Sequence, residues 1–67
     1  MAWSWTVESY WPTGDTAATE SAGRLIDVAR FLERERIDRG LRVVVRPALD
    51  DRQTATVDDL LRKRGNR

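Results

Sequence analysis

Residues 1–11 read MAWSWTVESYW and contain all three tryptophans of a 67-residue chain. The apolar side chains of this stretch share odd positions: Trp3, Trp5, Val7 and Trp11. Alternation with period two in aromatic and β-branched residues is typical of a strand with one buried face. The pattern predicts a strand over residues 2–11 with Trp3 and Trp5 in the core, because large aromatic side chains dominate burial in small proteins.

The alternative use of these indoles is an exposed aromatic platform for nucleobases or for a partner protein. Platforms for nucleic acid usually carry interleaved basic residues. Residues 1–23 contain no Lys or Arg, which disfavours nucleic acid as the ligand of this segment. Tyr10 and Trp11 precede the strand-breaking Pro12, and we expect them to be the exposed aromatic pair. Exposed Trp and Tyr are enriched among the residues that dominate protein interfaces.

A long helix is predicted over residues 16–39. Apolar residues at helical spacing form its core stripe: Ala18, Ala22, Leu25, Val28, Ala29 and Leu32. Phe31 falls outside this stripe, so we expect it to be partly exposed and able to contact a partner. Gly40 suits the left-handed position that follows a helix end.

The remainder of the chain predicts a strand over residues 41–47, a short helix over 57–64 and a basic tail over 65–67. Thr56 is the expected N-cap of the short helix, with Asp59 three residues later. Asp50 and Asp51 are expected in the preceding loop.

This order of elements predicts an α/β (α+β) fold, a single two-layer β-α-β-α domain over residues 1–67. Two neighbouring strands joined by a long helix would be parallel, with a right-handed crossover. Two strands are marginal as a sheet in water. The chain has no Cys and no His, so neither a disulfide nor a typical zinc site can reinforce its small core. We therefore expect a partner or a second copy to complete the sheet.

Enzymatic activity is not expected, because the usual catalytic parts are missing. Without His or Cys, the serines lack a conventional base. The paired carboxylates Asp50–Asp51 and Asp58–Asp59 are adjacent in sequence and point in different directions. No glycine loop for phosphate and no calcium-loop spacing is present. The sequence predicts no cofactor, no metal and no small-molecule substrate.

A cytoplasmic protein without membrane association is expected. No apolar run approaches the ~18 residues typical of a membrane span. The first residues lack the basic and then apolar pattern of a secretory signal.

The function expected from these features is non-catalytic protein–protein interaction, as a homo-oligomer or as an accessory or inhibitory subunit of a larger protein. The predicted contact residues are Tyr10, Trp11, Phe31, Arg42, Val44 and Arg46. A partner strand added to the edge of residues 41–46 would gain backbone hydrogen bonds. Arg42 and Arg46 would set its register by binding carboxylates.

The alternative is a small dimeric nucleic-acid-binding regulator. Its predicted phosphate contacts are Arg42, Arg46, Arg62, Lys63 and Arg64. The net charge of only +1 favours the protein-binding hypothesis, since acidic residues neutralise most of the basic ones.

Overall fold

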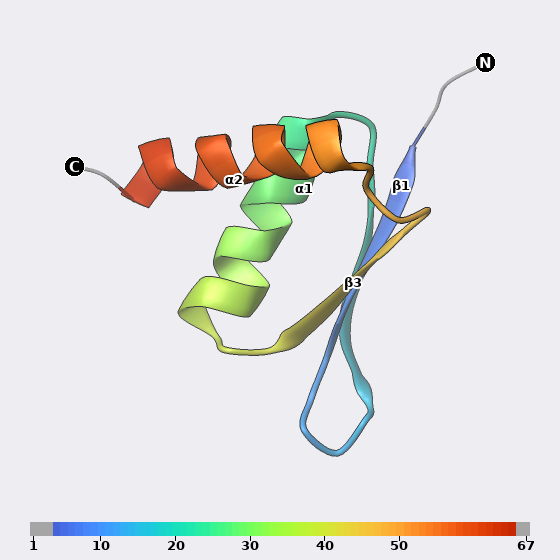
Figure 1. Ribbon diagram of the computed structural model, residues 1–67. Coiled ribbons are helices and arrows are strands. Elements are labelled where there is room, and N and C mark those ends of the chain that lie inside the picture. The colour runs from blue at the N-terminus through green and yellow to red at the C-terminus, as the bar shows by residue number, and fades with distance from the viewer. Residues whose placement is uncertain (1–3, 66–67) are drawn as a thin grey trace.

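The protein folds as a three-stranded antiparallel sheet whose helices all lie on one face (Figure 1). This computed structural model describes residues 4–65, and side chains as far as residue 63. The elements in chain order are β1 (Trp5–Tyr10), β2 (Thr16–Ala22), α1 (Leu25–Leu32), η1 (Glu33–Asp38), β3 (Arg42–Arg46) and α2 (Asp51–Gly65). The predicted two-layer α+β class is confirmed, but the order is β-β-α-β-α and not β-α-β-α.

Strand β2 occupies the first part of the predicted helix over residues 16–39, which is therefore wrong there. A tight turn follows β1, in which the Trp11 amide donates to the Asp15 carbonyl at 2.8 Å. Gly14 adopts a φ of 98° in this turn, a conformation that glycine enters most readily. The turn returns the chain along β1, so residues 16–22 pair with that strand before they can start a helix.

The later part of the predicted helix is confirmed from Leu25 to Asp38. Its last six residues, η1, form a wider π-type helix that continues directly from α1. Gly40 has a φ of 70° just beyond the helix end, in the left-handed conformation expected of it.

The sheet order is β2-β1-β3, with β1 antiparallel to both neighbours. The first strand and β3 are neighbours in the sheet, but the parallel arrangement and right-handed crossover expected for neighbouring strands are wrong. Because β2 reverses the chain first, α1 connects β2 to β3, which flank β1 on its two sides. The third strand comes from the chain itself, and the sheet stays open with β2 and β3 at its edges.

The core lies between the inner face of the sheet and the helices. Trp5 is 6% exposed, which confirms its predicted place in the core, whereas Trp3 lies outside the described residues. The buried cluster comprises Trp5, Val7, Ala22, Val28, Ala29, Phe31, Leu32 and Val57. It draws on β1, β2, α1 and α2, so each of these elements depends on the others for burial.

Helix α2 begins at Asp51, earlier than the predicted start at residue 57. Asp50 caps it: its carboxylate accepts from the Gln53 amide at 2.7 Å, while the Gln53 side chain accepts from the Asp50 amide at 3.0 Å. This reciprocal pair is a capping box. Thr56, the predicted cap, lies within the helix and donates to the Arg52 carbonyl. The longer helix packs Val57 against α1.

Candidate functional site

The candidate site is the face of the sheet that no helix within residues 4–65 covers (Figure 1). We call it the outer face and define it by the side chains at even positions of β1 and β3, with their neighbours on β2. In the register of the strands, Tyr10 pairs with Arg42, Glu8 with Val44 and Thr6 with Arg46. Four of the predicted contact residues, Tyr10, Arg42, Val44 and Arg46, therefore share one surface.

Both arginines of the outer face are held by residues of β1. Arg46 Nη1 donates to Glu8 Oε1 at 2.8 Å, and the Arg42 guanidinium lies 5.1 Å from the centre of the Tyr10 ring. A guanidinium carries five N–H donors. The contacts therefore orient Arg42 and Arg46 and leave donors on each for a ligand, with the half-buried Val44 between them.

A hollow of about 500 Å³ lies at the end of the outer face, between the β1–β2 turn and the residues that lead into β3. Tyr10, Trp11 and Arg42 line part of it. Trp11 is 43% exposed, as predicted, whereas Tyr10, expected to be exposed with it, is half-buried. The Arg39 guanidinium lies 4.9 Å from the centre of the Trp11 ring. The hollow thus joins Trp11 to the outer face.

Phe31 does not belong to this surface. It is 1% exposed within the core, so the expectation that it lies partly exposed is wrong. The core stripe of α1 is wider than predicted, because α1 packs against both the sheet and α2.

The basic residues of the predicted nucleic-acid set do not gather on one surface. Arg42 and Arg46 project from the outer face, whereas Arg62 and Lys63 belong to α2, which packs on the helical side of the sheet. Lys63 pairs with Asp59 at 3.2 Å. The side chain of Arg64 lies outside the described residues.

The two edges of the sheet differ in their protection. Along β2, the pairing with β1 shifts register near Tyr10, and Glu20 projects on the inner side, where Arg34 Nη2 donates to it at 2.5 Å. Bulges and inward charges are devices that protect an edge from pairing with another strand. Strand β3 has an unbroken register and carries only Val43 and Val45 on its inner side. Its edge lacks both of these devices, and its protection consists of the charges of Arg42 and Arg46 and of the adjacent Pro47.

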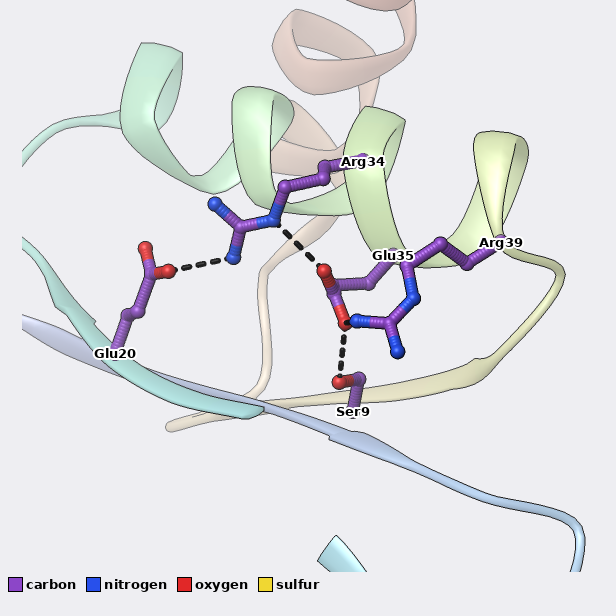
Figure 2. Close-up of polar contacts among 5 residues, drawn as sticks. All are labelled: Ser9, Glu20, Arg34, Glu35 and Arg39. Atoms are coloured by element: carbon purple, nitrogen blue, oxygen red, sulfur yellow. Dashed lines mark hydrogen bonds and ion pairs between the residues drawn. The ribbon is translucent and has the colours of Figure 1, made fainter. Parts of the chain in front are cut away.

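A buried carboxylate lies beneath the sheet, at Glu35 of η1 (Figure 2). Glu35 is 1% exposed and Ser9 of β1 is fully buried. The Ser9 hydroxyl donates to Glu35 Oε1 at 2.7 Å, and Arg39 Nη1 donates to the same oxygen at 2.9 Å. Arg34 Nε donates to Glu35 Oε2 at 2.7 Å and links this carboxylate to Glu20 on β2 (Figure 2). The contacts of Glu35 and Arg39 therefore connect the helical layer to the centre of the sheet and to Trp11.

Sequence patterns did not reveal Glu35. The pattern over residues 16–39 includes Ala18 and Ala22 in the helical stripe, and these two residues place its predicted centre closer to Ala29. On a helical wheel with about 100° per residue, the buried side chains of the true helix fill an arc with Phe31 at one border and Ala29 at the other. Glu35 falls near the middle of this arc. The apolar pattern from Leu25 onward, read alone, is the signal that locates this carboxylate.

The pKa of Glu35 is lowered from its ordinary value of 4.5, with the hydrogen bond from Arg34 as the largest cause. The hydrogen bonds from Ser9 and Arg39 and the charge of Arg39 act in the same direction, and burial opposes them. Because folding lowers this pKa, the ionised carboxylate stabilises the folded state above the unfolded value of the pKa. That contribution is lost as the pH falls through the lowered pKa.

We predict that the stability gap between the wild type and Glu35→Gln narrows on acidification below pH 4.5, the ordinary pKa of this carboxyl. Glutamine does not titrate, so the difference isolates the ionisation of Glu35 from that of the other acids. Urea unfolding followed by tryptophan fluorescence at a series of pH values measures the gap. A gap that stays constant or widens toward low pH would contradict the assignment.

Neither a cluster of metal ligands nor a membrane-spanning helix is found in the part of the chain that the structure describes. Residues 4–65 contain no group of three or more carboxylates placed to hold a metal ion. No helix in this part of the chain is long and apolar enough to cross a membrane.

No protein-family model, curated protein or solved structure matches this chain.

Proposed function

We propose that the protein is a non-catalytic protein–protein interaction module that docks through β3 and the adjoining outer face. It acts as a homo-oligomer or as an accessory or inhibitory subunit of a larger protein. The observation that supports this proposal is the edge of β3, which within residues 4–65 pairs with β1 alone and lacks the bulge and inward charge of β2.

The chemistry of β3 suits the addition of another strand. Alternate backbone N–H and C=O groups of an edge strand point away from the sheet and can bind a partner's backbone. Val43 and Val45 are half-buried at the rim of the core, so an added strand would cover apolar surface that the chain itself leaves partly open. Arg42 and Arg46 would then meet the partner's outward side chains.

The nucleic-acid alternative has less support. The basic residues of α2 lie on the helical side of the sheet, so they do not join Arg42 and Arg46 in one phosphate-binding surface. Binding to DNA or RNA would appear as retention on a nucleic-acid column that falls about tenfold or more between roughly 50 and 200 mM salt.

Val44→Lys is the variant that tests the proposed surface, with Thr19→Lys as its matched control. Val44 and Thr19 both pair with Glu8 and both face outward, but one lies on β3 and the other on β2. We expect immobilised wild type to retain one protein at near-equimolar yield from a source lysate. A lysine on an edge strand opposes strand addition, so Val44→Lys should reduce this yield at least tenfold, and Thr19→Lys should change it less than twofold.

Circular dichroism checks that both variants remain folded. Sedimentation equilibrium of the purified chain covers the homo-oligomer, whose association should respond to Val44→Lys in the same way. Equal capture and equal association for wild type and Val44→Lys would overturn the assignment of the surface to β3.

A further inference from the structure

The sequence of β3 reads the same in both directions. Residues 42–46 are RVVVR, with Val44 at the centre and an arginine at each end. When two copies of this strand pair antiparallel over their full length, Arg42 of each lies directly opposite Arg46 of the other. Like charges directly opposite each other destabilise a strand pair. A second copy of the chain is thus a poor occupant of the full β3 edge.

The same spacing specifies what a good occupant carries. On a paired strand, the residues opposite Arg42 and Arg46 lie four positions apart and point to the same side. Carboxylates at both places would match the two guanidinium groups. The positions between them that point inward would lie beside Val43 and Val45, which favours apolar side chains there.

Val44 adds a restriction at the centre of the site. It is half-buried and pairs with Glu8, whose carboxylate is already held by Arg46. A third acidic residue, opposite Val44, would lie beside this apolar side chain without a cation of its own, which disfavours its charge. The outer face therefore favours an acidic, neutral, acidic alternation and disfavours a continuous acidic run.

We propose that β3 binds an extended segment of another protein in which two Asp or Glu residues, four positions apart, face Arg42 and Arg46 across a neutral central residue. This inference rests on the proposed docking function, and of its two forms it selects the subunit of another protein over the homo-oligomer. Recognition combines backbone pairing along β3 with the charge match at its two ends.

Synthetic peptides test the inference on the full chain labelled with ¹⁵N. The probe peptide is TEVTVET, the charge control is TKVTVKT and the central control is TEVEVET. We expect the probe to shift the amide resonances of β3 and leave those of β2 nearly unchanged. TKVTVKT should bind at least tenfold more weakly, because attraction becomes repulsion at both ends. TEVEVET should also bind more weakly than the probe, because its central carboxylate would lie beside Val44 and gain no cation.

A charge exchange identifies the contact. Arg42→Glu should weaken binding of TEVTVET and restore binding to one of the mixed peptides, TEVTVKT or TKVTVET, according to the direction of the added strand. Failure of both mixed peptides to restore binding would overturn the pairing of Arg42 with a carboxylate.

The outcomes separate this inference from the function on which it rests. If all peptides shift β3 equally, the acidic specification is wrong and β3 remains a docking edge. If no peptide shifts β3, the inference is wrong, and the capture experiment with Val44→Lys decides the proposed function independently. Dimerisation through β3 that Val44→Lys abolishes, or shifts of β3 caused only by an oligonucleotide, would also overturn it.

Discussion

Glu35→Ala is expected to lower the free energy of unfolding by about 3 kcal/mol, since removing one member of a buried ion pair costs about 3–5 kcal/mol. We place the value at the lower end because Arg34 and Arg39 are half-exposed and can turn to water. Ser9 cannot, so its buried hydroxyl loses its acceptor. Since a core of this size supplies only ~3–5 kcal/mol, much of the variant should be unfolded at 25 °C. Circular dichroism and urea unfolding measure the loss.

Companion variants separate the charge of Glu35 from its packing. Glu35→Gln keeps an acceptor for Ser9 and should cost less than Glu35→Ala. Ser9→Ala should cost less in the Glu35→Ala background than in the wild type, since replacing both partners removes the unsatisfied group. Asp38→Ala is the control, because Asp38 is an exposed acid of the same helical segment and should change stability by less than about 0.5 kcal/mol. Equal losses for Glu35→Ala and Asp38→Ala would contradict the role of the buried carboxylate.

Trp5→Ala is expected to cost about 3–5 kcal/mol, the usual range for truncating a buried aromatic residue. Trp5 is almost fully buried in the cluster that joins the sheet to α1 and α2, so the variant should lose cooperative folding at room temperature. Thermal unfolding by circular dichroism provides the measurement.

Trp11→Ala supplies the comparison for this prediction. Trp11 is the same residue type a few positions along the chain, but it is 43% exposed and contacts Arg39 through its ring face. We expect a loss of about 1 kcal/mol or less, as for a cation–π contact near the surface. Equal stability of Trp5→Ala and Trp11→Ala would contradict the burial of Trp5 on the inner face of β1.

The parts of the fold that the sequence predicted are those with a strong local pattern. Alternating aromatic and β-branched residues identified β1 and its buried face, and the apolar run before Pro47 identified β3. The same alternation on β3 placed Arg42, Val44 and Arg46 on one face, which the register confirms. These patterns are strong because burial of one side of a strand constrains every second residue.

The prediction failed where local pattern and tertiary context disagree. Residues 16–22 read TAATESA, with two alanines at helical spacing and no large apolar side chain. The turn at Gly14 places this segment against β1, and pairing there outweighs the helix propensity of its alanines, since tertiary context commonly overrides propensity. The pattern contained no indication of this partner. The error then shifted the predicted stripe of α1, which misplaced Phe31 and concealed Glu35.

The side chain of Arg39 links the buried part of the protein to its surface. Its guanidinium contacts Glu35 in the interior and the ring of Trp11 at the surface. A ligand that displaced the Trp11 ring would also disturb Arg39, which is one of the cations that neutralise the Glu35 carboxylate. Ligand binding next to Trp11 and the ionisation of Glu35 under the sheet are therefore coupled through the side chain of Arg39.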